Sequence, residues 1–89
     1  MHPGADMPTE FDAATCYQRL YESTGGPYWG VIVAGRTGDS FEARLTELWG
    51  PDNRRLEEAI VGCRETGTTL EAAIDTLKKT ARAWIACRV

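Results

Sequence analysis

The sequence predicts a small α+β domain that consists of an N-terminal helix, a β-hairpin and two C-terminal helices. Two observations predict this class. Apolar side chains repeat at helical spacing over residues 69–86, and the segment from Tyr28 to Leu48 holds a β-branched run followed by alternating apolar and polar residues. Part of that segment also fits one face of a helix, so the alternative is an all-α four-helix domain.

Length and composition are those of one compact unit. The chain has 89 residues, of which 43% are hydrophobic, and a formal net charge of −3. This content favours one domain with a modest core, over residues 9–89, behind a flexible tail at residues 1–8. The acidic balance disfavours non-specific attraction to phosphate groups or anionic lipid.

The first predicted element is a helix over about residues 10–23. Thr9 can cap it, and Glu10 and Asp12 place negative charge in the first turn, where the helix dipole favours it. The pair Gly25-Gly26 followed by Pro27 ends the pattern. The apolar residues at helical spacing are Ala13, Cys16, Tyr17, Leu20 and Tyr21.

A β-hairpin is predicted next, with strands at about 28–35 and 40–48 joined by the five residues 35–39. A single strand at 28–34 would leave its backbone groups without partners, and pairing with the following segment removes that difficulty. The competing helix would use Phe41, Leu45, Leu48 and Trp49, at i, i+4, i+7 and i+8. We expect both edges of this hairpin to stay open, which predicts pairing with a second copy of the chain.

Two helices forming an αα-hairpin are predicted after the break at Gly50-Pro51. Asp52 or Asn53 can cap the first, which ends at Gly67 and carries Leu56, Ala59, Ile60 and Cys63 on one face. Thr68 and Glu71 then have capping-box spacing before the last helix, at about 69–86. Its apolar series is Leu70, Ala73, Ile74, Leu77, Ala81, Trp84 and Ile85.

The cysteines and the single histidine form no catalytic pattern, so we predict that the protein is not an enzyme. Cys16, Cys63 and Cys87 are odd in number and form no CxxC pair, which does not suit a disulfide framework or a zinc site. The one histidine, His2, lies in the tail, so a cysteine nucleophile would lack a histidine base. We therefore predict no catalytic, cofactor-binding or metal-binding residues.

The sequence shows no pattern typical of a secretory signal or of a membrane-spanning segment. The first ten residues show no basic region followed by an apolar one, and no apolar run approaches the roughly 20 residues that cross a bilayer. We expect a cytoplasmic protein without a membrane partner.

The aromatic residues suggest what the domain binds. Tyr28 and Trp29 are neighbours, so in a strand they point to opposite faces, and one of them can serve as a surface anchor with Tyr17 or Tyr21 beside it. Acidic helix positions could meet a basic groove of a partner; these are Glu57, Glu58, Glu71 and Asp75. The sequence thus predicts a small acidic protein-interaction module whose partner it does not specify. Such a module could be an inhibitor or accessory protein of the phage or mobile-element type, which binds a host protein complex. Homodimer formation is part of this prediction.

A helix-turn-helix DNA-binding regulator is the first alternative. The two C-terminal helices and the tight turn at Gly67 would place Thr68, Thr69 and Ala72 toward a major groove. Glu71 and Asp75 would then face phosphates, so nucleic acid is not the expected partner.

The second alternative rests on the tetrapeptide Gly38-Asp39-Ser40-Phe41. It resembles the GDSL-type attachment site of acyl and peptidyl carrier proteins, with Phe41 where leucine is usual. The resemblance implies an acidic four-helix domain in which Ser40, at a helix start, would carry phosphopantetheine.

Overall fold

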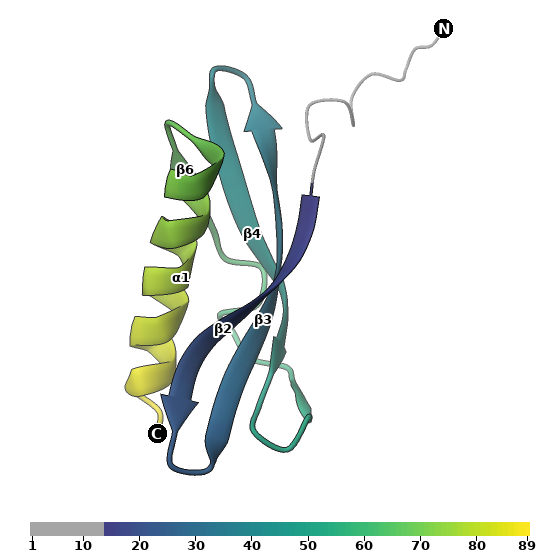
Figure 1. Cartoon of the computed structure of the whole chain (residues 1–89), viewed down its shortest axis with the longest axis vertical. Helices are drawn as coiled ribbons and strands as arrows, with labels where there is room; N and C mark the ends of the chain where they lie inside the picture. Colours follow the sequence, from purple (N-terminus) through teal and green to yellow (C-terminus); the bar gives the residue numbers. More distant parts are fainter. Residues whose placement is uncertain (1–13) are drawn as a thin grey trace, which may run out of the picture.

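The computed structural model describes residues 14–89, which form an antiparallel sheet with one helix packed along one of its faces (Figure 1). The elements in chain order are β2 (Ala14–Ser23), β3 (Gly26–Thr37), β4 (Ser40–Trp49), β5 (Arg55–Leu56), β6 (Arg64–Gly67) and α1 (Leu70–Ala86). The three long strands form a meander, and β5 and β6 both pair with β4. The described residues hold neither an N-terminal helix nor two C-terminal helices, so the predicted fold class and the all-α alternative are both wrong.

The predicted hairpin is confirmed, because β3 and β4 pair antiparallel from Trp29 opposite Trp49 to Thr37 opposite Ser40. Its turn is shorter than expected, since only Gly38 and Asp39 separate the two strands. Gly38 has a φ of 65°, while Asp39 has no positive φ. A positive φ at the first central residue alone is the pattern of a type II′ turn, whose twist matches that of paired strands.

The predicted helix at 10–23 is wrong where the structure describes it, since residues 14–23 are strand β2. Residues 10–13 and the predicted tail at 1–8 lie outside the described residues. Arg19 pairs with Trp29 and Tyr21 with Tyr28, so Leu20 is an extra residue that forms a β-bulge. The bulge puts both Leu20 and Tyr21 against the core on the same side as Cys16. This i, i+4, i+5 spacing imitates a helix.

A second bulge explains the helical reading of residues 41–49. Val31 pairs with Glu47 and Ile32 with Leu45, so Thr46 is the extra residue in β4. The core side chains on either side of this bulge, Leu45 and Leu48, are therefore three positions apart instead of two. The core side chains of β4 therefore have the sequence spacing of a helix, although the backbone is extended.

The predicted helix after Pro51 is also wrong, because residues 51–67 form turns and the short strands β5 and β6. The Gly62 N–H donates to the Leu45 carbonyl at 2.8 Å, and the Leu45 N–H donates to the Cys63 carbonyl at 2.9 Å. Asn53 and Gly62 have φ values of 59° and 100°, which a continuous right-handed helix excludes. Backbone groups of this segment therefore form hydrogen bonds with β4, and not within an αα-hairpin.

The C-terminal helix is confirmed as α1. Thr69, one residue later than the predicted cap, is the N-cap, and its Oγ1 accepts from the Ala72 N–H at 3.0 Å. The buried stripe of α1 is Ala73, Leu77, Ala81 and Ile85. It packs on the inner face of the sheet, whose fully buried members are Leu20, Ile32, Ala34, Ala43, Leu45 and Leu48.

The edges of the hairpin differ from the prediction. Within residues 14–89, β2 covers the free edge of β3, and β5 and β6 cover that of β4. The hairpin itself therefore offers no open edge, and the long strand at the sheet margin is β2.

Replacement of Gly67 by alanine tests the close contact between β6 and α1. A Cβ at Gly67 would lie 2.6 Å from the Ala73 nitrogen and 2.9 Å from the Ala72 carbonyl carbon, and backbone atoms cannot move aside cheaply. We expect Gly67→Ala to lower the free energy of unfolding by about 1–3 kcal/mol in urea denaturation. Gly25→Ala is the control, since its Cβ would come no closer than 3.8 Å to Ser23 Oγ. Equal stability of the two variants would contradict this packing.

Candidate functional site

The face of the sheet that points away from α1 carries a row of four large side chains, one from each of four strands. The register places Arg19 of β2 opposite Trp29 of β3, Trp29 opposite Trp49 of β4, and Trp49 opposite Arg55 of β5. We call this face the outer face. Two tryptophans thus lie side by side with an arginine at each end of the row.

A groove of about 440 Å³ opens beside this row, lined by Tyr17, Trp29, Trp49 and Asn53. Tyr17 is 73% exposed and Trp29 is 38% exposed, and these are large apolar surfaces for a small domain to leave in water. A concave site with aromatic walls and a few polar groups is the usual form of a binding site. We refer to it as the aromatic groove.

Strand β3 is apolar on both faces. Ile32 and Ala34 face the core, while Trp29, Val31 and Val33 alternate with them. Val31 is only 7% exposed, although it is not a member of the core cluster. An antiparallel sheet with one solvated face normally alternates apolar and polar residues, so the apolar outer positions of β3 depart from the usual pattern.

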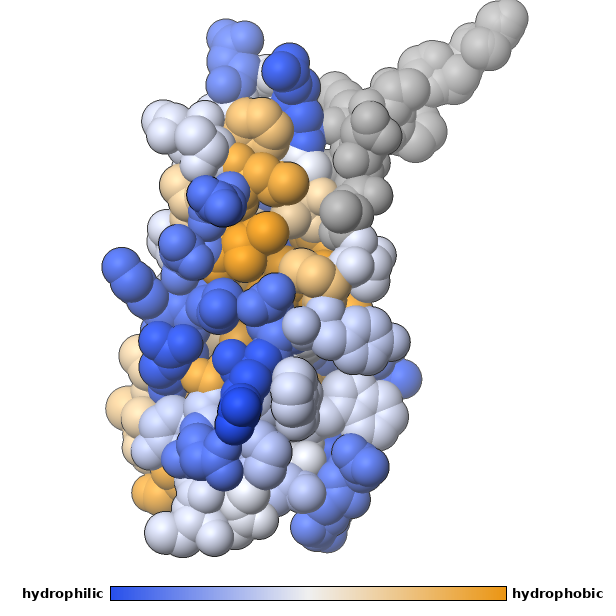
Figure 2. Space-filling view, viewed as in Figure 1, coloured by the Kyte–Doolittle hydropathy of each residue, from blue (hydrophilic) through white to orange (hydrophobic). Residues whose placement is uncertain are grey.

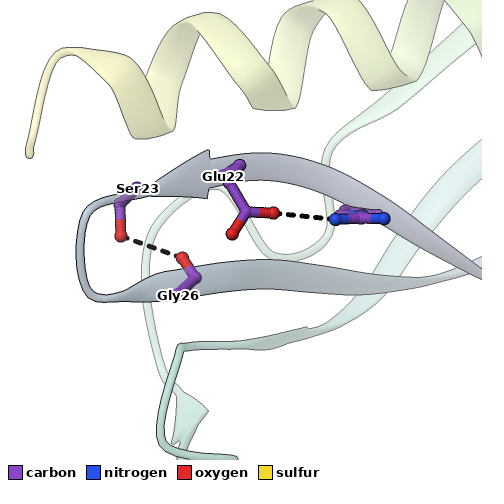
Figure 3. A network of polar contacts seen from close by, with 4 residues as sticks. Glu22, Ser23 and Gly26 are labelled. Atoms are coloured by element: carbon purple, nitrogen blue, oxygen red, sulfur yellow. Dashed lines mark hydrogen bonds and ion pairs between the residues drawn. The ribbon is translucent and has the colours of Figure 1, made fainter.

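Polar contacts hold parts of the groove in place. Arg19 forms an ion pair with Glu22 at 2.7 Å next to the β2–β3 turn (Figure 3), and its guanidinium lies 5.8 Å from the centre of the Trp29 ring. In the same turn, the Ser23 hydroxyl donates to the Gly26 carbonyl at 2.9 Å (Figure 3). On the other side of the groove, Trp49 Nε1 donates to Glu47 Oε1 at 3.0 Å. The indole N–H of Trp29 donates to no group within residues 14–89.

The structure separates the six predicted partner-binding residues. Trp29 lines the groove, whereas its neighbour Tyr28 packs against the core in an edge-on contact with the ring of Tyr21, at 6.4 Å between centroids. The prediction that these two point to opposite faces is confirmed. The acidic residues are exposed. Glu57 forms an ion pair with Arg55 at the end of the row, at 3.7 Å, and Glu58 follows it, whereas Glu71 and Asp75 are on α1.

The net negative charge of the chain comes from residues 1–13. Of the 13 acidic residues, Asp6, Glu10 and Asp12 precede Ala14, which leaves ten, and all ten lysines and arginines follow it. Residues 14–89 are therefore neutral in formal charge. Figure 2, which is coloured by hydropathy, shows hydrophilic side chains over much of the visible face and apolar ones gathered between them near the β3–β4 turn.

Sequence reasoning found Trp29 and suggested Tyr17 or Tyr21 as its neighbour, and Tyr17 is the one that lines the groove. It did not place Trp49 or Asn53 there, since Trp49 was used in the competing helix and Asn53 was a candidate helix cap. One signal was available, since Thr15, Tyr17 and Arg19 alternate with Cys16, Gln18 and Leu20, and the exposure of the two sets alternates in the same way.

The structural settings of the two alternatives are not found in residues 14–89. A helix-turn-helix needs two helices, and α1 is the only helix that the structure describes there. Ser40 is the first residue of strand β4 and follows the type II′ turn, so it does not stand at a helix start.

The cysteines and acidic residues form no reactive cluster among the described residues. Cys16, Cys63 and Cys87 are free thiols, and residues 14–89 contain no group of three His, Cys, Asp or Glu side chains placed to hold a metal ion. Burial raises the pKa of the Cys63 thiol, and the negative charge of Glu65 raises it further. In the described part of the chain, no helix is long and apolar enough to cross a membrane.

Comparison of the chain with protein-family models, with curated proteins and with solved structures found no match.

Substitution of the two neighbouring aromatic residues tests the assignment of faces. We expect Tyr28→Ala to lower the free energy of unfolding by about 2 kcal/mol, because it removes a ring packed on the core. Trp29→Ala should cost about 0.5–1 kcal/mol, the range of a cross-strand contact on an exposed face. Urea denaturation of both variants gives the comparison, and a larger loss for Trp29→Ala would contradict the assignment.

Thiol alkylation tests the environment of Cys63. Because its pKa is raised, a smaller fraction of Cys63 is thiolate at pH 8, and only the thiolate reacts. We expect iodoacetamide to label Cys63 more slowly than the exposed Cys87 at pH 8, with the rate at Cys63 still rising as the pH is increased. Two single-cysteine variants, one retaining each thiol, allow the rates to be measured by mass spectrometry. Faster labelling of Cys63 would show that it is neither buried nor beside a negative charge.

Proposed function

We propose that this protein is a non-enzymatic protein-interaction module that docks its partner on the outer face of the sheet. The observation that supports it best is the aromatic groove, where Tyr17, Trp29 and Trp49 meet on a rigid sheet. Tryptophan, tyrosine and arginine are the residues most enriched at binding hot spots, and the two aromatic ones bury much area with little loss of rotamer freedom. Here all three types stand in adjacent rows of one face.

The rigid setting of the groove adds to this support. Trp29 and Trp49 are held by the ladder between β3 and β4, and Trp49 is oriented by its bond to Glu47. Side chains that are ordered before binding lose less entropy when the partner arrives. We therefore expect the groove to have the same shape before and after the partner binds.

The proposal includes the role of an inhibitor or accessory protein, of the phage or mobile-element type, that occupies a site on a larger host complex. A domain this small with one aromatic face suits such a role, because its face can cover a site without contributing chemistry of its own. The acidic positions Glu57, Glu58, Glu71 and Asp75 stay a prediction for a second contact area, since none of them lines the groove.

Photo-crosslinking from two positions tests the proposal. A benzophenone amino acid replaces Tyr17 in the groove, or the exposed Ala83 of α1 as the matched control, which belongs to neither contact area. In cells of the native source, we expect position 17 to form a discrete protein adduct that position 83 does not form. Adding Trp29→Ala to the position-17 variant should reduce that adduct at least about tenfold, as for loss of a hot-spot residue. The same adducts from both positions, or adducts to nucleic acid, would contradict the proposal.

A further inference from the structure

We infer that the aromatic groove binds a proline-rich segment of the partner in the polyproline II conformation, with an acidic residue at each end. This inference rests on the proposed function and specifies the chemistry of the partner.

The first argument concerns hydrogen bonds. The backbone groups of β3 and β4 are used in the sheet ladders, so a ligand lying over the face meets side chains only. The groove and its rim supply mainly donors: the Trp29 indole N–H, the Tyr17 hydroxyl, the Asn53 amide and the arginine guanidiniums. A polyproline II segment has no internal hydrogen bonds and exposes its carbonyl acceptors, and proline has no N–H that would be left unpaired. Its acceptors match the donors of the groove.

The second argument concerns shape. Aromatic-lined grooves bind polyproline II segments because the flat rings accept proline rings and the ligand is already ordered. A helix is about 10–12 Å across and would extend along the strands, onto the charged side chains of Arg44 and Glu47. A second copy would need to bury about 800 Å² per partner, which is more than the four lining residues can offer, so charged side chains beside them would be buried as well.

The third argument concerns length and charge. Arg19 and Arg55 belong to strands three spacings apart, which is about 14 Å. A polyproline II segment rises about 3.1 Å per residue, so about five residues cover that distance. Arg19 pairs with Glu22 and Arg55 pairs with Glu57. All four side chains are more than half exposed, and exposed pairs of this kind are worth little, so both guanidiniums can turn to a ligand carboxylate. The preferred ligand is an acid, four prolines and an acid.

Three blocked peptides test the inference: Asp-Pro-Pro-Pro-Pro-Asp, the same peptide with glycine for proline, and the same with lysine for aspartate. Each is titrated into the full chain and followed by tryptophan fluorescence and by amide chemical shifts. We expect saturable binding of the first peptide, with shifts centred on Trp29 and Trp49. The glycine and lysine peptides should bind at least about tenfold more weakly.

Variants of the protein assign the binding to the groove. Trp29→Phe keeps a ring but removes the N–H donor, and we expect a loss of about three- to tenfold. Trp84→Phe is the matched control, because Trp84 lies on α1 beside Arg88, with 4.1 Å from the guanidinium carbon to the ring centre, and should bind as the unaltered chain does. Arg19→Gln should reduce affinity for the aspartate peptide about threefold and leave the preference for proline over glycine unchanged.

The outcomes separate this inference from the proposed function. Failure of the proline peptide at millimolar concentration, together with a Trp29-dependent protein adduct from position 17, would overturn the inference alone. Self-association in light scattering that depends on Trp29 would also overturn the inference, because it would show that a second copy of the chain occupies the groove. Trp29-dependent binding of oligo(dT) without peptide binding would overturn both proposals.

Discussion

The pairing of β3 with a bulged strand on each side is the constraint on which the rest of the structure depends. A shift of one residue moves every later side chain of a strand to the opposite face. The extra residue Thr46 therefore turns Leu48 into the core and Trp49 to the outer face, and the extra residue Leu20 turns Tyr21 inward and Glu22 outward, beside Arg19. Without the bulge in β4, the aromatic groove would lose one of its two tryptophans.

Side chains satisfy the backbone where the two ladders are interrupted. The carbonyl of Leu20 accepts from Arg82 Nε at 2.8 Å, which ties α1 to the margin of the sheet. The Thr46 hydroxyl donates to the Val31 carbonyl at 3.1 Å, on the strand that the bulge faces. A bulge whose polar groups are paired is a stable feature, because it leaves no buried donor or acceptor without a partner. The position of Trp49 on the outer face is therefore supported by the bond from Thr46 to Val31.

One strand serves both the core and the candidate binding face. Ile32 and Ala34 of β3 lie under α1, while Trp29, Val31 and Val33 face outward. A site on paired strands is held more rigidly than a site on loops, which favours recognition by shape. The neutral charge of residues 14–89 agrees with this, since it leaves contact area and hydrogen bonds, rather than long-range attraction, to select a ligand.

The sequence by itself determined the elements whose signals are local. The periodicity of residues 70–86 depends on contacts within a few turns, and the turn at Gly38-Asp39 depends on two residues, so helix α1 and the β3–β4 hairpin could be predicted. Alternation also placed Trp29 and Tyr28 on opposite faces. The strand β2, the course of residues 51–67 and the meeting of Tyr17 with Trp49 were decided only by tertiary structure. The reason is that a bulge breaks the two-residue period in a way that imitates a helix, and only the neighbouring strand, distant in sequence, shows that the residue is an extra one.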